Sequence, residues 1–340
     1  MISERKTFPA FRMVVMFVSI AVAGTVVSCS SGSDSDSGDP AAASAYVSTD
    51  GAFPVSIDTA FGEVTVDARP DRVVALGWAD AETALALGVQ PVGASDWLAF
   101  GGEGVGPWAD GLYDVAPEMI GTLEPSYEAV AELAPDVILD TKSSGDRDRY
   151  ERLSRIAPTI ALPGGADNYL TTVEQQVTMV SAALGESTRG AELLGDLDAG
   201  FESAASAHPE FEGRTITVGA FSGTGFGAYI SDSTRVLFMK KLGFVSNPVI
   251  DALPPQGFSV PISEEELNKL DADVVVIFPI EKSSSEVVDN PLFQSIPAVR
   301  DGRSLVFDDP AVAKSYSTNS ILSAHYALDS VVPAVASLLQ

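Results

Sequence analysis

The sequence is poor in the residues that build metal centres and disulfide frameworks, since its 340 residues include one cysteine and two histidines. A single thiol cannot form an internal disulfide, and no HxxxH or CxxC pairing is present. A zinc or copper site is therefore disfavoured, and His208 and His325 are interpreted as structural. No G-x-S-x-G motif occurs, because Ser222 stands one place too late in the phrase 219–223. No metal ligand, cofactor or catalytic residue is predicted.

Basic residues are also scarce, with 20 lysines and arginines against 47 aspartates and glutamates and a net charge of −27. A surface this acidic repels the phosphates of nucleic acids and anionic lipid head groups. A nucleic-acid partner is thus excluded. Solubility outside the cell or adaptation to salt explains the acidity without a cationic partner.

The N-terminal segment has the order of a secretory signal peptide over residues 1–28. Arg5, Lys6 and Arg12 precede an apolar run, 13–27, whose 15 residues are short for a helix crossing about 30 Å of hydrocarbon. Cys29, directly after residues 1–28, is the sole cysteine, and its place resembles the lipobox of bacterial lipoproteins, in which that cysteine is lipidated. We expect a protein lipid-anchored to the outer face of the cell membrane, with the N-terminal lipid as its membrane contact. A cleaved signal peptide that leaves a free thiol is the alternative.

Small and acidic residues fill 29–45, so this segment is predicted to be a disordered tether. The remaining 295 residues are enough for two compact lobes. Short apolar runs bounded by turn residues alternate with helical patterns, first over 72–140 and again over 215–307, which favours α/β lobes with largely parallel sheets. Between them, apolar residues at helical spacing predict one or two long helices interrupted near Gly185.

We therefore predict an α/β protein of two Rossmann-like lobes bridged by a long α-helix, with a ligand cleft between the lobes. The expected boundaries are 46–165 for the N-terminal lobe, 166–210 for the bridging segment and 211–340 for the C-terminal lobe. One phrase occurs twice, at 126–139 and 263–276, without a gap. Each copy is typical of a capped helix that runs into a buried strand, so each lobe is expected to contain one equivalent unit.

Aromatic and cationic residues follow several of the predicted strands, where open parallel sheets bind their ligands. Among the residues that follow predicted strands, Trp78, Trp97, Lys142, Phe221, Lys314 and Tyr316 are candidate ligand-binding residues. Three more candidates stand elsewhere: Trp108 in the glycine-rich stretch 100–108, Tyr229, and Arg235 at the start of a predicted helix. Aromatic rings beside a few cations suit a bulky, flat, partly anionic ligand. The phrase 223–228 fits G-x-G-x-x-A, but no helix is expected to open on it, so these glycines are interpreted as a flexible loop.

The order and spacing of several short phrases resemble a known family. They are RPDRVVAL at 69–76, LALGVQPVG at 85–93, the first copy of the repeat from Glu128 to Leu139, LSRIAPT at 153–159 and ISEE at 262–265. The chain is similar over 54–340 to the substrate-binding lipoproteins of ABC importers for ferric siderophores, of the iron(III)-siderophore and ferric dicitrate type in actinobacteria.

This resemblance implies an extracytoplasmic receptor that binds iron(III) held by a siderophore and delivers it to an ABC importer permease without catalysis. It also implies that one glutamate on each lobe pairs with arginines of the permease, and these fall on Glu128 and Glu265. A tethered delivery protein works as a monomer, which is the expected state.

Three other functions stay open from the sequence. Haem or a cobalamin is the nearest rival ligand, with Tyr113, Tyr169, Tyr229 or Tyr316 as a phenolate ligand to haem iron. A tethered extracellular hydrolase is a rival of another class, since carboxylates are plentiful. A signalling or adhesion module that uses the cleft as a sensor would need no permease partner.

Overall fold

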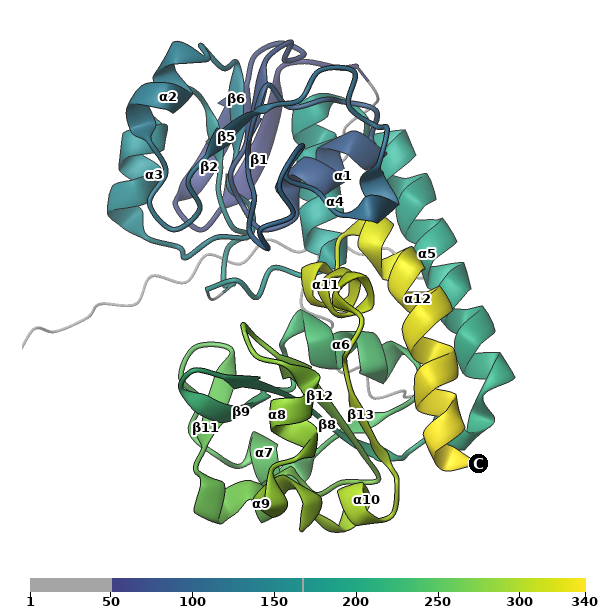
Figure 1. The fold of residues 1–340 in the computed structure, drawn as a ribbon. Helices are drawn as coiled ribbons and strands as arrows, with labels where there is room; N and C mark the ends of the chain where they lie inside the picture. Colours follow the sequence, from purple (N-terminus) through teal and green to yellow (C-terminus); the bar gives the residue numbers. More distant parts are fainter. Residues whose placement is uncertain (1–50, 167) are drawn as a thin grey trace, which may run out of the picture. The chain divides into compact units, whose positions relative to one another are not determined.

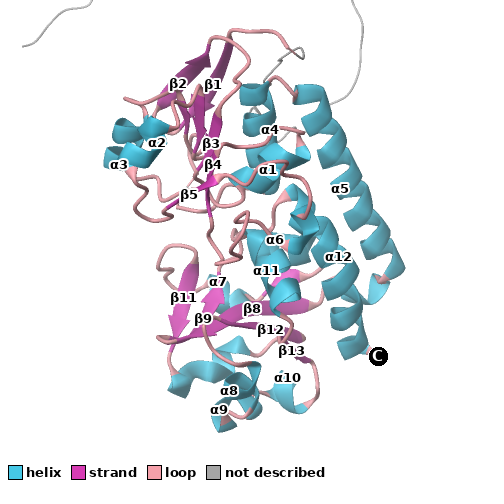
Figure 2. Ribbon diagram, turned by 45° about the horizontal axis from the view of Figure 1, so that its top comes forward, coloured by secondary structure: helices cyan, strands magenta, loops and turns pink. Residues whose placement is uncertain are grey.

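The computed structural model describes residues 51–166 and 168–340. The predicted signal peptide, Cys29, the predicted tether and the first residues of the N-terminal lobe lie outside this part of the chain. The described residues form one compact unit. Within it, two sheets with their own helices form two lobes (Figures 1 and 2).

The first lobe contains a five-stranded, entirely parallel sheet in the order β5-β4-β3-β6-β7. Its strands are short and buried, which is why they appear in the sequence as brief apolar runs. The strands are β3 (Val73–Ala75), β4 (Gly93–Ser95), β5 (Glu118–Ile120), β6 (Val137–Leu139) and β7 (Thr159–Ile160). A hairpin of β1 (Val55–Thr59) and β2 (Gly62–Val66), which the sequence analysis did not predict, precedes them.

Alternate residues of these strands point to opposite faces, and helices cover both. Val74 and Ile138 pack in one cluster with Val130 of α2 (Tyr127–Glu132) and Leu153 of α3 (Arg147–Leu153). Val73 and its alternating neighbours pack in a second cluster with α1 (Asp80–Ala86) and α4 (Val173–Leu184). The lobe is therefore a three-layer α/β sandwich.

The second lobe contains a mixed sheet in the order β11-β9-β8-β12-β13, with β10 paired to β8. Its strands are β8 (Thr215–Ser222), β9 (Gly225–Tyr229), β10 (Val245–Ser246), β11 (Ser259–Ile262), β12 (Val274–Pro279) and β13 (Ser304–Val306). The pairs of β8 with β10, β8 with β12 and β12 with β13 are parallel. Strand β9 is antiparallel to both of its neighbours, β8 and β11. The glycine phrase 223–228, expected to be a loop, is instead the turn of the β8–β9 hairpin and the first four residues of β9, so no helix opens on it.

Short helices surround this second sheet. They are α6 (Thr234–Lys241), α7 (Pro248–Asp251), η3 (Glu264–Leu270), α8 (Ser284–Val288), α9 (Pro291–Gln294) and α10 (Pro297–Arg300). The second copy of the repeat thus forms a 3₁₀ helix, where the first copy forms the α-helix α2.

Long helices join the lobes. After α4, Gly185 adopts a left-handed conformation with φ of 71°, and α5 (Ser187–Ala207) follows. Near the C-terminus, α11 (Pro310–Thr318) ends at Asn319, which is left-handed with φ of 46°, and α12 (Ile321–Ala336) follows. Three short 3₁₀ turns complete the chain: η1 (Pro107–Ala109), η2 (Pro209–Phe211) and η4 (Ser337–Leu339).

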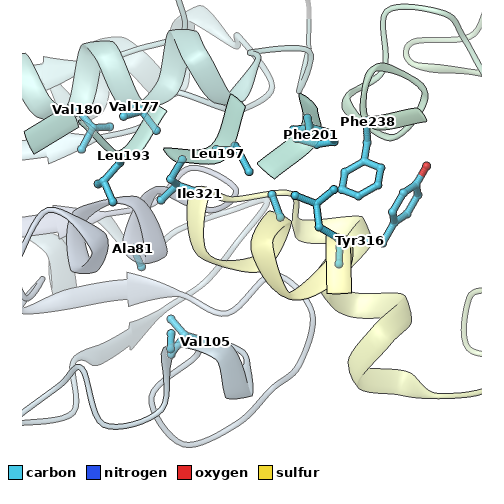
Figure 3. Packing of buried hydrophobic residues seen from close by; sticks show 14 of the residues in the cluster. Ala81, Val105, Val177, Val180, Leu193, Leu197, Phe201, Phe238, Tyr316 and Ile321 are labelled. Carbon is cyan, nitrogen blue, oxygen red and sulfur yellow. The ribbon is translucent and has the colours of Figure 1, made fainter. Parts of the chain in front are cut away.

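Helix α12 runs beside α5 and also packs against α1 and η1 of the first lobe (Figure 1). Figure 3 shows Leu193 and Leu197 of α5 close to Ile321 of α12, in the same cluster as Val177 of α4. Half of the apolar window over Ile321–Leu339 is buried, as expected for a core helix. The two lobes are thus joined by a packed helical layer, which the sequence indicated only through α4 and α5.

The sequence repeat has a structural counterpart. Asp136 accepts hydrogen bonds from the backbone N–H groups of Asp71 and Arg72, at 2.9 Å each, just before β3. Asp273 accepts one from the backbone N–H of Thr215, also at 2.9 Å, at the start of β8. In each lobe this aspartate opens the strand that lies parallel to the first strand of the sheet. The repeated phrase therefore fixes the central strand pair of each lobe.

Candidate ligand-binding site

A cavity of about 390 Å³ lies between the two lobes. We call it the interlobe cavity. The first lobe supplies Trp78, Trp97, Leu98, Leu123, Lys142, Tyr169 and Leu170, and the second supplies Tyr229, Ser233, Thr234, Arg235, Phe258, Ile280 and Ser317. Its volume and its mainly apolar walls with a few polar groups are typical of small-molecule sites.

The first lobe builds its wall at the point where its strand order reverses. β3 is flanked by β4 on one side and by β6 on the other, so the crevice at their carboxyl ends is the expected ligand position in an open parallel sheet. Trp78 follows β3, Lys142 follows β6, and the Trp78 N–H donates to the Lys142 carbonyl at 2.8 Å. The two side chains therefore reach the cavity from adjacent, directly bonded loops.

A buried carboxylate fixes these two loops. Asp80 accepts hydrogen bonds from the N–H of Gly77 at 3.0 Å, the N–H and hydroxyl of Thr141, and the amide of Gln176 at 2.7 Å. Burial raises the pKa of Asp80 to about 6, although these hydrogen bonds oppose the shift. Asp80 joins the β3 loop, the β6 loop and α4 beneath the cavity.

A buried ion pair between Arg149 and Asp140 positions a residue at the mouth of the interlobe cavity. Arg149 of α3 binds Asp140 through two hydrogen bonds, of 2.7 and 3.0 Å, and donates to the carbonyls of Thr122 and Leu123. Bidentate pairing of this kind fixes both direction and distance. The exposed Leu123 side chain is thereby positioned at the cavity mouth.

Aromatic rings form a continuous belt around the interlobe cavity. The ring centroids of Trp78 and Trp97 are 5.6 Å apart, and those of Trp97 and Tyr169 are also 5.6 Å apart. Phe258 continues the belt at 6.2 Å from both Tyr169 and Tyr229. The indole N–H of Trp97 donates to the Leu76 carbonyl at 3.0 Å, so its ring is oriented by the sheet. The belt presents large apolar faces of fixed orientation to a ligand.

Two cations face the cavity from opposite lobes. Lys142 is 3% exposed, and its Nζ has no hydrogen-bond partner among the described residues. Burial, together with the positive charge of Arg235, lowers the pKa of Lys142 to about 7. The Arg235 guanidinium lies 4.6 Å from the Tyr229 ring centroid and 5.7 Å from that of Trp78, and it donates to the Ser317 hydroxyl at 2.6 Å. Within the described ranges, neither Lys142 nor Arg235 has a carboxylate as an ion-pair or hydrogen-bond partner, so the site holds positive charge that no bonded anion offsets.

The sequence model of the family described as periplasmic binding protein matches residues 73–311, which include both sheets and most of the cavity. The chain belongs to the periplasmic binding protein family.

Relatives of this periplasmic binding protein include siderophore binders. A protein of Bacillus subtilis strain 168 named "Probable siderophore-binding lipoprotein" is 28% identical over 286 residues, which cover 78% of this chain and 82% of the relative. The Fe(3+)-citrate-binding protein of the same strain is 27% identical over 254 residues, covering 71% and 74%. The solved structure of a Streptococcus pneumoniae TIGR4 protein in complex with ferrichrome is 27% identical, has a TM-score of 0.72, and covers 84% of this chain and 98% of that one.

Five of the predicted ligand-binding residues of this periplasmic binding protein meet in the interlobe cavity: Trp78, Trp97, Lys142, Tyr229 and Arg235. Four others do not line it. Trp108 donates its indole N–H to the buried Glu82 at 2.8 Å, and Phe221 packs against Phe226 in the second lobe. Lys314 lies 4.8 Å from the Phe100 ring centroid, and Tyr316 is 0% exposed with its hydroxyl bonded to the Arg235 carbonyl. Tyr316 thus positions a cavity residue from beneath.

Several lining residues were missed as ligand-binding candidates. Tyr169, named only as a haem ligand, and Phe258 lie in irregular segments that no periodicity marks. Ile280 directly follows β12, but it is neither aromatic nor cationic and so was not among the strand-end candidates. Ser233 caps α6, and Ser317 lies on α11.

The predicted docking residues lie on the surface of the two lobes. Glu128 is exposed on α2 and Glu265 is exposed on η3, and neither makes an ion pair within the described residues. The neighbouring Glu266 differs, since it pairs with Lys269 at 2.5 Å. Free, exposed carboxylates at equivalent places of both lobes are available to a partner.

Metal-ligating side chains are not grouped in the described ranges, where no cluster of three or more His, Cys, Asp or Glu residues is found. His208 bonds Glu210 at 2.9 Å and stacks on Phe211, and His325 is exposed on α12. A second cavity, of about 410 Å³, lies against α5 and α6. None of its lining residues is among the described buried polar groups that lack a partner, in contrast to Lys142 and Arg235.

Proposed function

We propose that this periplasmic binding protein is an extracytoplasmic receptor that captures a ferric siderophore and delivers it to the permease of an ABC importer. The observation that carries the proposal is the interlobe cavity, which is lined by an aromatic belt and by two cations that have no hydrogen-bonded counter-ion among the described residues. Relatives whose names specify siderophores, ferric citrate and ferrichrome support it.

Binding needs no covalent step in this proposal. The chelator's own oxygens hold iron(III), which is cargo, so the protein supplies no ligand to the metal. Trp78, Trp97 and Phe258 pack on the organic rim of the chelate, and Lys142 and Arg235 offset the charge of its oxygens. The same chelate leaves unchanged when the permease accepts it.

Delivery requires attachment and docking. We propose that Cys29 is lipidated, which holds the protein at the outer face of the cell membrane, and that the chain acts as a monomer. Glu128 and Glu265 would pair with cations of the permease, one on each lobe. Their exposure and their lack of an ion-pair partner within the described residues support this role.

The test is a titration of intrinsic tryptophan fluorescence, because two of the three tryptophans line the cavity. The panel contains ferric hydroxamate, ferric catecholate and ferric citrate chelates, their iron-free forms, haemin and cobalamin. We expect saturable quenching by a ferric chelate, weakened in Trp97→Ala and retained in Trp108→Phe, which removes an indole outside the cavity. If haemin or cobalamin binds and no ferric chelate does, the bound compound is the cargo instead of a ferric siderophore. Turnover of a substrate would indicate a hydrolase.

A further inference from the structure

Lys142 and Arg235 form an unneutralised pair in the interlobe cavity. Lys142 comes from the loop after β6 and Arg235 from the first turn of α6, so each lobe contributes one cation. The Nζ of Lys142 and the Nε of Arg235 both lack a hydrogen-bond partner within the described residues. A buried ammonium without a partner is costly, and an arrangement that leaves one facing a cavity indicates a missing anion.

The neighbouring carboxylates do not supply that anion. The charge of Asp80 acts on Lys142 and opposes the lowering of its pKa, but both oxygens of Asp80 already accept hydrogen bonds from Gly77, Thr141 and Gln176. Asp140 is bound by Arg149 through both oxygens. The other titratable groups that line the cavity, Tyr169 and Tyr229, are phenols, and burial raises the pKa of Tyr169, which keeps it neutral.

From this geometry we propose that the cavity selects anionic ferric chelates over neutral ones, and that Lys142 takes up one proton as the chelate binds. The anionic oxygens of the chelate, whether carboxylate or catecholate, would lie between the Lys142 ammonium and the Arg235 guanidinium and satisfy both. This inference rests on the proposed function, since it names the charge class of the cargo.

The direction of the proton transfer follows from burial. In the free protein the pKa of Lys142 is lowered to about 7 by burial and by Arg235, so above that pH the amine is largely neutral. An adjacent anion favours the charged form and raises the pKa again. Binding above about pH 7 therefore takes one proton from solvent, and affinity falls about tenfold per pH unit. Below about pH 7 the amine is already protonated, so the affinity levels off.

Isothermal titration calorimetry of the purified full chain tests the proposal. At about pH 8, binding enthalpies measured in phosphate and in Tris differ by the number of protons exchanged times the difference in buffer ionisation enthalpy. The probes are ferric citrate, a ferric tris-catecholate and a neutral ferric hydroxamate, each titrated across a pH range in which the probe itself does not titrate. We expect uptake of about one proton with the anionic probes, whichever of the two binds, and weaker binding of the neutral hydroxamate.

Lys142→Met and Lys282→Met form the matched pair of variants. Methionine fills the space of the buried lysine stem without charge, so Lys142→Met should stay folded, which its melting temperature checks. It should lose about 10- to 100-fold in affinity for the anionic chelate below pH 7, and it should lose the proton uptake. Lys282 pairs with Glu286 on the surface, so Lys282→Met should leave both the affinity and the proton uptake unchanged.

The outcomes separate the two proposals. Tight binding of the neutral hydroxamate without proton uptake, or unchanged proton uptake in Lys142→Met, would overturn this inference and leave the receptor function standing. If no ferric chelate of any charge binds, the receptor function fails and this inference fails with it.

Discussion

Asp80 illustrates how one buried side chain determines the shape of the candidate site. It accepts hydrogen bonds from three separate segments: the turn after β3, the loop after β6, and α4. Those first two segments carry Trp78 and Lys142. The position of both cavity residues thus depends on a carboxylate that does not line the cavity.

Asp80→Asn tests this dependence. An amide NH₂ would replace an oxygen that now faces only donors, which leaves buried groups unsatisfied. We expect the free energy of unfolding to fall by about 2–4 kcal/mol at pH 7. Urea unfolding measures it, with the exposed Asp67→Asn as a control expected to stay within about 0.5 kcal/mol of the parent. An equal effect of both substitutions would contradict the role of Asp80.

The same residue gives a pH dependence. The pKa of Asp80 is about 6 in the folded protein and about 4 in an unfolded chain. The folded state therefore binds more protons between these values, so the stabilisation from this group is complete below about pH 4 and is lost as pH rises to 6. The difference in unfolding free energy between the parent and Asp80→Asn should shrink by roughly a kcal/mol per pH unit across this window. If the unfolding free energies of the two proteins changed in parallel with pH, the pKa of Asp80 would be unperturbed.

Sequence reasoning found those cavity residues that directly follow buried strands. Trp78 and Lys142 belong to this group, because an apolar run marks the strand and the sheet geometry then places what comes next. Tyr169 and Phe258 could not be assigned in this way, since their segments have no period and their positions depend on packing between distant parts of the chain. Tyr316 was expected in the cavity because a strand-end rule cannot tell which face of the following helix is buried.

Helix α5 shows how local sequence and packing compete within one element. Gly190 and Gly195 both lie inside it, and neither has a positive φ. A Cβ on Gly190 would lie 2.5 Å from the Ser181 hydroxyl of α4, whereas a Cβ on Gly195 would meet nothing within 4 Å. Gly190 is therefore required for the close approach of α4, and Gly195 is not.

Alanine substitution at these two glycines should have opposite effects. Gly195→Ala should stabilise the protein by about 0.5–1 kcal/mol, because alanine loses less backbone entropy in a helix. Gly190→Ala should destabilise it by about 1–3 kcal/mol through overpacking against α4. Denaturant unfolding of both variants measures the signs, and a shared sign would contradict the packing of α4 on α5.

The long helices were predicted well from the sequence because their apolar spacing extends over many turns. Helix α11 was not predicted, and neither was its end at Asn319, although asparagine is one of the few residue types that tolerate a left-handed conformation. The β1–β2 hairpin was missed as well, since its two strands have only five residues each and half-exposed faces.

Within the described unit, the two lobes repeat one plan: a parallel strand pair opened by an aspartate, preceded by a helix with an exposed glutamate. The repeated phrase predicted this relation, and in the structure Asp136 and Asp273 accept hydrogen bonds from backbone N–H groups at equivalent positions, those of Arg72 and Thr215. It did not predict the antiparallel edge of the second sheet, which arises from the β8–β9 hairpin. It also did not predict that α12 packs on the first lobe.

The repeated glutamates give a prediction at the level of the assembled transporter. Glu128→Lys combined with Glu265→Lys should abolish uptake of the ferric chelate by cells and leave binding by the purified protein unchanged, because both residues are exposed and outside the cavity. A matched control is Glu132→Lys combined with Asp289→Lys, which makes the same change in charge at other exposed positions. Uptake that survives the first pair, or fails equally with the second, would remove these glutamates from docking.

Native mass spectrometry of the protein with a panel of ferric chelates shows whether the interlobe cavity carries an intact ferric chelate. We expect a complex of one chain with one intact chelate, iron included, that is weakened in Trp97→Ala and releases the chelate chemically unchanged. If no ferric chelate forms a complex, or if a cleaved chelate is recovered, the protein is not a receptor that binds and releases a ferric chelate.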